Sequence, residues 1–296
     1  MTGLIDVRRR IDGASCMIAG CFAFSLSGAS AKFLGTKLPP VELAFLRAGF
    51  GLLIVIVAWR AIAELRVLKD PAWHAARGIL GVTALFCILV AFTHLPIALV
   101  SVVLAGRTFL LIGLAAALCN ERPGPIVWSA ACLGVSGVAI ALWPQLSSAF
   151  ADDFTPTVAT VGAAAALGAA LTSSGSQLAV RRLTDTNSPS VIVIVFGIFA
   201  FTVLSIPAAW TWTAPGPGDW GILIALGVFG VCSQWCSARC YSRIGASRAA
   251  PIDLAQIPVG ACVGWLLFSE VPDIWTFAGA VLIVTGALLV TAADTK

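Results

Sequence analysis

The chain has 296 residues, of which 59% are hydrophobic and only 11% are charged. A soluble domain carries about a quarter charged residues, so this composition excludes a largely soluble protein. The formal net charge of +4 includes no basic run beyond Arg8–Arg10, so a nucleic-acid partner is not expected.

Apolar stretches of about 20 residues with almost no charge predict membrane-spanning helices. Their apolar residues are continuous rather than alternating, unlike the strands of an outer-membrane barrel. The predicted fold is therefore an all-α integral membrane protein with ten transmembrane helices. These lie at residues 14–34, 41–62, 76–93, 97–119, 124–143, 157–180, 189–210, 219–242, 247–269 and 272–292.

The distribution of lysine and arginine predicts the orientation of these helices. With a cytoplasmic N-terminus, fourteen of the eighteen basic residues fall in cytoplasmic segments, two (Lys32 and Lys37) fall outside, and Arg47 and Arg107 lie within spans. Such an asymmetric distribution of positive charge predicts a multi-pass protein of the inner membrane with both termini in the cytoplasm. Lipid is thus one expected partner.

The cysteines and histidines give no sign of a metal or redox centre. None of the nine cysteines forms a CxxC pair, and the chain has two histidines. Cys232, Cys236 and Cys240 share one helical face, which suits helix packing better than a soft-metal path. No phosphate-binding loop or catalytic motif is present, so no cofactor, metal or catalytic residue is predicted.

The sequence repeats itself at a fixed offset. Leu118–Gly137 aligns without a gap on Leu267–Gly286, with seven identities in twenty positions and an offset of 270 − 121 = 149. The chain therefore divides into a first five-helix repeat (residues 1–146), an external linker (147–156) and a second five-helix repeat (157–296). The segment after Arg8–Arg10 could also be read as a cleaved signal peptide, but its removal would destroy the repeat.

A duplicated unit with five spans must insert the second time upside down. The halves are therefore expected to have inverted topology, which is the architecture of alternating-access transporters with a site between the repeats.

Several motifs resemble the EamA-type transporters of the drug/metabolite transporter superfamily. They are Gly264–Pro272 with its Phe-x-Glu-x-Pro ending, Leu38–Arg47 at the entry to the second helix, and Asn120–Pro123 after the fourth. The resemblance covers nearly the whole chain. It implies an inner-membrane carrier of small metabolites, such as an exporter of amino acids or related compounds, and central roles for helices four and nine. The family often has proline where this chain has the sequence around Arg107.

Two charges inside predicted spans are the main site candidates. Arg107 lies roughly 18 Å and Asp253 roughly 9 Å from the cytoplasmic edge, at about 1.5 Å per residue. Gln256 is the repeat counterpart of Arg107, and Asp253, Gln256, Gly260 and Gly264 share one helical face. A charge in lipid is costly and normally faces a cavity or a partner.

Three roles stay open for this pair. The two residues could form a structural latch, they could bind an amino-acid-like solute through its carboxylate and ammonium, or Asp253 could carry protons as the coupling ion. Weaker substrate-binding candidates are Trp235, Gln234, Tyr241 and Gln177. Glu121 and Glu270 are expected to accept hydrogen bonds from loop amides, and Arg47 is expected to pair or pack within its own half, with Glu42 as one candidate partner.

Three classes of function follow from these patterns. The favoured one is a secondary transporter that moves a small polar metabolite by alternating access around a central cavity. The alternatives are an integral-membrane enzyme, for which the external face offers only scattered acids, and a non-transporting scaffold or accessory subunit, which would not need Arg107 and Asp253 inside the membrane.

Overall fold

The computed structural model describes residues 2–57, 69–110, 124–144, 146–147, 157–244 and 252–293. These ranges consist of helices joined by turns and loops and contain no strand. The helices are α1 (Thr2–Leu34), α2 (Pro40–Val57), α4 (Pro71–His94), α5 (Ile97–Ala105), α7 (Pro125–Ala141), α9 (Val158–Leu183), α10 (Pro189–Trp210), α11 (Trp220–Ile244), α13 (Gln256–Phe268) and α14 (Ile274–Ala293).

Five helical segments are long and apolar enough to cross a membrane: residues 12–34, 71–94, 158–183, 189–210 and 220–243. Four shorter apolar helices cover residues 97–110, 128–141, 256–268 and 274–289. The protein is thus an all-helical, multi-pass membrane protein, as predicted. Part of the predicted linker and of the second and fourth spans lies outside the described residues, and the ten-span topology stays a prediction.

The helices begin at residues that favour helix starts. Pro71, Pro125 and Pro189 stand in the first turns of α4, α7 and α10, where proline loses no intrahelical hydrogen bond. Ser188 caps α10 by accepting a hydrogen bond from the amide of Val191, and Thr157 caps α9 in the same way. Each of three helix pairs, α2 with α10, α4 with α11 and α7 with α14, has starts 149 residues apart.

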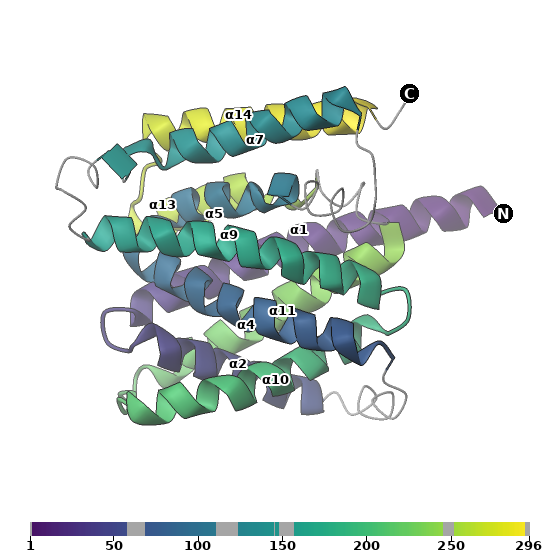
Figure 1. Cartoon of the computed structure of the whole chain (residues 1–296). Coiled ribbons are helices and arrows are strands. Elements are labelled where there is room, and N and C mark those ends of the chain that lie inside the picture. The colour runs from purple at the N-terminus through teal and green to yellow at the C-terminus, as the bar shows by residue number, and fades with distance from the viewer. Residues whose placement is uncertain are drawn as a thin grey trace.

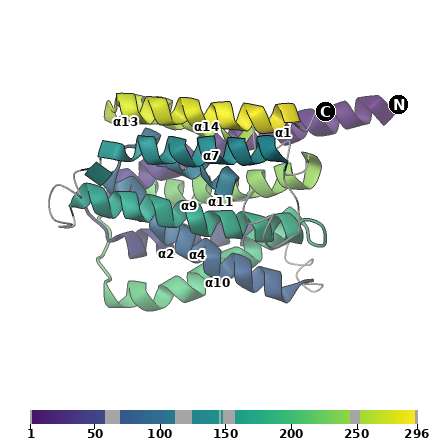
Figure 2. The same cartoon turned by 45° about the horizontal axis from the view of Figure 1, so that its top comes forward.

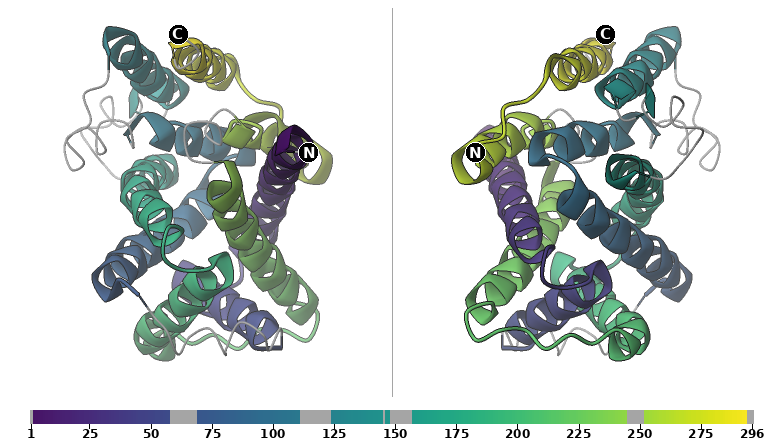
Figure 3. Two further views of the ribbon diagram at one scale, coloured as in Figure 1. Left: turned by 90° about the vertical axis from the view of Figure 1, so that its right-hand side faces the viewer. Right: turned by 90° about the vertical axis from the view of Figure 1, so that its left-hand side faces the viewer.

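The helices pack in pairs that join distant parts of the sequence. Helix α1 packs along α11 and α4 packs along α9, while α7 and α14 lie side by side over α5 and α13 (Figures 1 and 2). In the end-on views of Figure 3, α1 crosses α11 on one side of the bundle and α4 crosses α9 on the other, with α2 and α10 beneath. The middle of the bundle therefore lies between the α1–α11 pair and the α4–α9 pair.

Small residues allow these close contacts. A Cβ atom added at Gly137 would lie 2.8 Å from the carbonyl oxygen of Gly279, and one added at Gly286 would lie 2.9 Å from that of Ala130. Because lipid supplies no hydrophobic force between helices, such close backbone approach and the packing it allows hold the helices together.

The connections gather at two opposite ends of the bundle. At the end where α4 begins, which we call the α4 end, the backbone of Lys69 exchanges hydrogen bonds with Asn187, and Arg243 pairs with Asp12 at 2.8 Å. The start of α1 and the last turn of α14 also lie toward this end (Figure 1). The opposite end, where α5 begins, we call the α5 end. The sequence predicts that the α4 end is cytoplasmic.

Candidate functional site

A cavity of about 120 Å³ lies among the crossed helices, toward the α4 end. Helices α1, α2, α4, α9, α10 and α11 contribute to its wall, together with residues beside the ends of α5 and α13. Its polar lining consists of Arg47, Arg77, Arg107, Ser173, Ser176, Gln177, Ser233, Gln234, Ser237, Tyr241, Asp253 and Gln256. A polar cavity inside an apolar helical bundle is the kind of place where a transporter holds its substrate.

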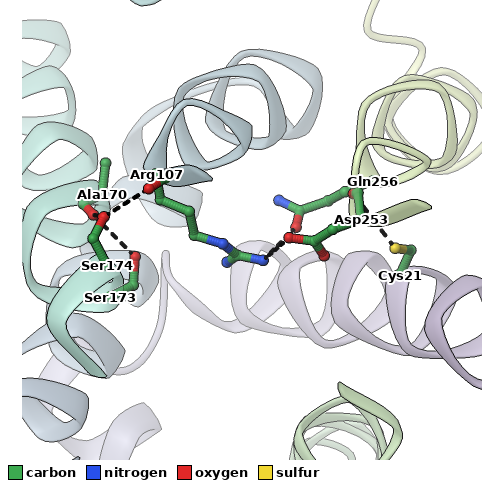
Figure 4. Close-up of polar contacts among 7 residues, drawn as sticks. All are labelled: Cys21, Arg107, Ala170, Ser173, Ser174, Asp253 and Gln256. Atoms are coloured by element: carbon green, nitrogen blue, oxygen red, sulfur yellow. Dashed lines mark hydrogen bonds and ion pairs between the residues drawn. The ribbon is translucent and has the colours of Figure 1, made fainter. Parts of the chain in front are cut away.

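Arg107 and Asp253 form a buried ion pair at the wall of this cavity (Figure 4). Nη2 of Arg107 donates to Oδ2 of Asp253 at 2.6 Å and to Oε1 of Gln256 at 3.4 Å. The backbone carbonyl of Arg107 accepts a hydrogen bond of 3.0 Å from Ser174 of α9. The sequence candidates Arg107, Asp253 and Gln256 are therefore brought together.

Both charges stand next to a short turn in an otherwise helical segment, which the sequence did not predict; Gly106 and Ala255 themselves keep right-handed α backbone angles. Helix α5 ends at Ala105 and the chain resumes its helix at Arg107, after a turn at Gly106. Asp253 lies before a turn at Leu254 and Ala255, and α13 begins only at Gln256. The predicted continuous span 247–269 is thus interrupted, and residues 245–251 lie outside the described ranges.

Gly260 and Gly264, which share the predicted face of the ninth helix with Asp253 and Gln256, are buried but pack against α5. A Cβ atom at Gly260 would meet the Ser101 side chain of α5, and one at Gly264 would lie 2.9 Å from Oε2 of Glu270. The two glycines are not among the residues that line the cavity, and their small size lets α13 pack against α5.

Arg77 lines the cavity, although from the sequence it counts among the basic residues of the cytoplasmic side, at the start of the predicted span 76–93. It lies in the second turn of α4, where Nη1 donates to Ser176 at 2.5 Å and Nη2 donates to Gln234 at 3.0 Å. Its guanidinium carbon lies 4.0 Å from the ring centroid of Phe196. All three partners are uncharged, so Arg77 brings a full positive charge to the cavity.

Arg47 is also at the cavity, and it bonds within its own half as expected, but to Ser27 rather than to the candidate partner Glu42. Nε of Arg47 donates to Ser27 at 3.3 Å, whereas Oε1 of Glu42 accepts from the backbone amide of Thr213 at 2.7 Å. Glu42 and Arg47 are five residues apart in α2, so they point to different sides of the helix.

The weaker candidates divide between the cavity and the outer surface. Gln177, Gln234 and Tyr241 line the cavity, and Gln234 is held by Arg77. Trp235 is not brought there: its side chain is on the outer side of α11, 37% exposed, with Arg239 stacked on its ring at 4.9 Å. Its neighbour Gln234 takes the inward position on the helix.

The α5 end of the bundle is held closed by polar contacts. Lys32 forms an ion pair with Glu270 and donates to the carbonyl of Leu95 at 3.0 Å, while Oε2 of Glu270 accepts from the amide of Ile97 at 3.0 Å. Glu270 thus accepts a backbone amide, that of the first residue of α5, and Glu121 lies outside the described residues. Lys37 donates to Asp219 at 2.7 Å, and this hydrogen bond lowers the pKa of the Asp219 carboxyl.

Several cysteines take part in packing, whereas Cys232 is exposed. Cys236 lies against Gly20 of α1, and Cys21 and Cys240 pack together with Met17. Within the described ranges, no three His, Cys, Asp or Glu side chains come together to hold a metal ion.

The sequence is similar to a set of membrane transporters over almost its whole length. It is 29% identical over 278 residues to the pseudopaline exporter of Pseudomonas aeruginosa, covering 93% of this chain and 94% of that protein. It is 26% identical to a riboflavin transporter of Vibrio cholerae, covering 97% and 95%, and 25% identical to an S-adenosylmethionine uptake transporter of Rickettsia felis, covering 94% and 93%. These relatives are transporters rather than enzymes.

The fold has a counterpart among solved structures. One crystal structure superposes with a TM-score of 0.68 over 98% of each chain, at 20% sequence identity. The model of the EamA-like transporter family matches residues 12–143 and 160–292. These matches confirm the resemblance found in the sequence: the chain belongs to the EamA-like transporter family of the drug/metabolite transporter superfamily.

Proposed function

We propose that the protein is a secondary transporter that moves a small polar metabolite, an amino acid or a related compound, across the inner membrane. It works by alternating access around the cavity, and export is the proposed direction. Arg107, Asp253, Gln256, Gln234, Gln177 and Tyr241 are the proposed substrate-contacting residues.

The observation that carries this proposal is the buried pair of Arg107 and Asp253 at the cavity wall. A charge inside a membrane protein is expensive and marks a pathway or a ligand site more often than a packing contact. Both residues stand next to a turn in the helical pattern, and the sites of several transporter folds lie at irregular helices near the middle of the membrane. An amino-acid-like solute offers a carboxylate for Arg107 and an ammonium for Asp253.

The duplication supports alternating access. The turns at Gly106 and Ala255 are 149 residues apart, as are the starts of three helix pairs. The helix contacts also repeat between the halves. Helix α1 packs on α11, and their counterparts in the other half, α9 and α4, pack on each other. If the halves are inverted repeats of residues 1–146 and 157–296, exchanging their conformations closes the cavity at the α4 end and opens it at the α5 end.

A binding screen followed by transport tests this proposal. The purified protein is screened by thermal unfolding against a metabolite panel, because a ligand that binds only the folded state raises the unfolding temperature. Each hit is then followed across the membrane of reconstituted vesicles. We expect at least one amino acid or related compound to stabilise the protein and to cross faster than in protein-free vesicles. Stabilising hits that never cross would contradict transport and favour a scaffold.

A further inference from the structure

The cavity carries more positive than negative charge. Three arginines line it, Arg47, Arg77 and Arg107, and among the described lining residues Asp253 is the one carboxylate. Asp253 is already engaged by Arg107 at 2.6 Å. Neither Arg47 nor Arg77 has an ion-pair partner within the described ranges. Among the described residues, these two positive charges therefore have no counter-charge inside the bundle.

Arg77 has donor capacity left over. Its two terminal nitrogens each bond to a neutral oxygen, while its buried Nε has no partner among the described residues. The Phe196 ring covers one face of the guanidinium and holds it in place. A guanidinium has five N–H donors in a planar fork, so an anionic group can bind it without displacing the existing neighbours.

Arg47 lies close to Arg77 around α11. A Cβ atom at Gly230 would meet the Arg47 guanidinium, and Arg77 bonds to Gln234 one turn further along the same helix. This spacing is about 6 Å along the helix axis. Arg47 is buried, with 9% of its surface exposed, and among the described residues it donates one side-chain hydrogen bond, to the neutral Ser27.

An uncompensated charge in such a place is unfavourable for the protein alone. Burying a charge without a partner costs more than the neighbouring dipoles return, and two like charges on one cavity add repulsion. A purely structural arginine would be expected to face a carboxylate, as Arg107 does. The arrangement is explained if the counter-charge arrives with the ligand.

We propose that Arg47 and Arg77 form an anion subsite and that the transported metabolite carries at least two carboxylates. The inference rests on the proposed transport function and narrows its substrate class. One carboxylate of the solute lies between Arg47 and Arg77, and the second reaches Arg107, where it competes with Asp253. Cationic and uncharged metabolites are disfavoured by the net charge of the cavity.

A matched series of small solutes tests the subsite. Glutarate has two carboxylates, glutaramate has one carboxylate and one amide, and glutaramide has two amides on the same carbon skeleton. Each is titrated into the purified protein at constant ionic strength, balanced with sodium chloride, while thermal unfolding is followed. We expect glutarate to raise the unfolding temperature in a saturable way, glutaramate to need at least tenfold higher concentration, and glutaramide to have no effect.

Arginine variants locate the effect. Arg47→Gln and Arg77→Gln should each shift the glutarate midpoint at least tenfold, whereas Arg239→Gln, which removes an arginine outside the cavity, should leave it unchanged. Arg77→Lys keeps the charge but loses the fork, so it should give an intermediate midpoint even if Arg77→Gln does not fold. The subsite is overturned if glutaramide stabilises as well as glutarate, if the cavity variants respond like the wild type, or if glutarate has no more effect than chloride.

Vesicle transport separates this inference from the function on which it rests. If glutarate binds through Arg47 and Arg77 but never crosses the membrane, the anion subsite stands and the transport function fails. If the vesicles transport a metabolite at the same rate in wild type, Arg47→Gln and Arg77→Gln, the transport function stands and the subsite fails.

Discussion

Arg107 and Asp253 neutralise each other across 146 residues of sequence, and each is bound in the structure by further polar groups. Gln256 shares Nη2 of Arg107, and the backbone carbonyl of Asp253 accepts the Cys21 thiol at 3.7 Å. A substrate that binds here must either displace this pair or bind beside it. The same contact can therefore act as a latch and as a ligand site, two roles that the sequence left open.

Replacing Asp253 tests whether it couples transport to protons. In Asp253→Asn the side chain keeps its size but can no longer gain or lose a proton. We expect the variant to lose the response of transport to a pH gradient across reconstituted vesicles while still exchanging substrate between the two sides. A pH response equal to that of the wild type would remove Asp253 from coupling and leave it as latch or ligand.

Sequence alone identified the charged residues whose position in a membrane span is unusual, but not the cavity residues whose position is common in membrane proteins. Arg107 and Asp253 stood out because a charge near the middle of an apolar span is unusual. Arg77 did not, because an arginine near a predicted helix end normally extends its long side chain to the interface. Only the packing of α4 against α9 and α10 turns it inward, onto Ser176 and Phe196.

The same limit explains why Trp235 was wrongly expected to line the cavity. Its depth in a predicted span suggested a pocket residue, yet the rotation of α11 about its axis decides which face meets the cavity. Gln234 and Ser237 face inward, so Trp235 faces outward. Helix rotation depends on neighbours distant in the sequence, here α1 and α2, and a nearly uniform apolar helix does not reveal it.

At the scale of helices, the spans were predictable because their length and hydrophobicity are set by the membrane. The turns at Gly106 and at Leu254 and Ala255 were harder to foresee, although Pro258 indicates where α13 begins. Proline is tolerated in the first turn of a helix and disfavoured in its interior, so Pro258 points to a helix that starts just before it. Helix α13 indeed begins at Gln256.

The contact between α7 and α14 depends on Gly279. A Cβ atom there would lie 2.5 Å from the carbonyl oxygen of Gly137 and 2.7 Å from the Cβ atom of Ala141. Backbone atoms cannot move aside as a flexible side chain can, so Gly279→Ala should cost about 1–3 kcal/mol of stability by overpacking. Thermal unfolding of the purified protein should show a lower transition temperature.

Gly221→Ala in α11 is the matched control, since no atom lies within 4 Å of its added Cβ. It should leave the transition temperature unchanged or slightly higher, because alanine favours a helix more than glycine does. Equal unfolding temperatures for the two alanine variants would mean that the close approach of α7 and α14 is not needed.

Over the whole molecule, the two ends of the bundle differ in how they are closed. The α5 end is joined by the pairs Lys32–Glu270 and Lys37–Asp219 and by the bond from Thr213 to Glu42. The cavity lies toward the α4 end, where α4 and α11 contribute Arg77 and Gln234. In an alternating-access cycle, the contacts of the α5 end must break when the cavity opens there.

Removing Glu270 should loosen the α5 end selectively. Glu270→Ala deletes the partner of Lys32 and the acceptor of the Ile97 amide, so hydrogen exchange at Ile97 should speed up at least tenfold. Glu270→Gln keeps an acceptor oxygen and should show a smaller effect. Peptides around Lys69 and Asp70, at the other end, should exchange as in the wild type. Unchanged protection at Ile97 in Glu270→Ala would show that Glu270 does not close this end.

A double-mutant cycle on Arg107 and Asp253, read out by both stability and vesicle transport, tests the central claim most directly. Arg107→Gln or Asp253→Asn alone leaves a charge without its partner, which should cost a few kcal/mol, whereas the double variant removes both charges and should cost less than the two losses added together. We predict that the double variant regains thermal stability without regaining transport. Full transport by the stable double variant would contradict the account, because the pair would then be structural only and the substrate would bind elsewhere.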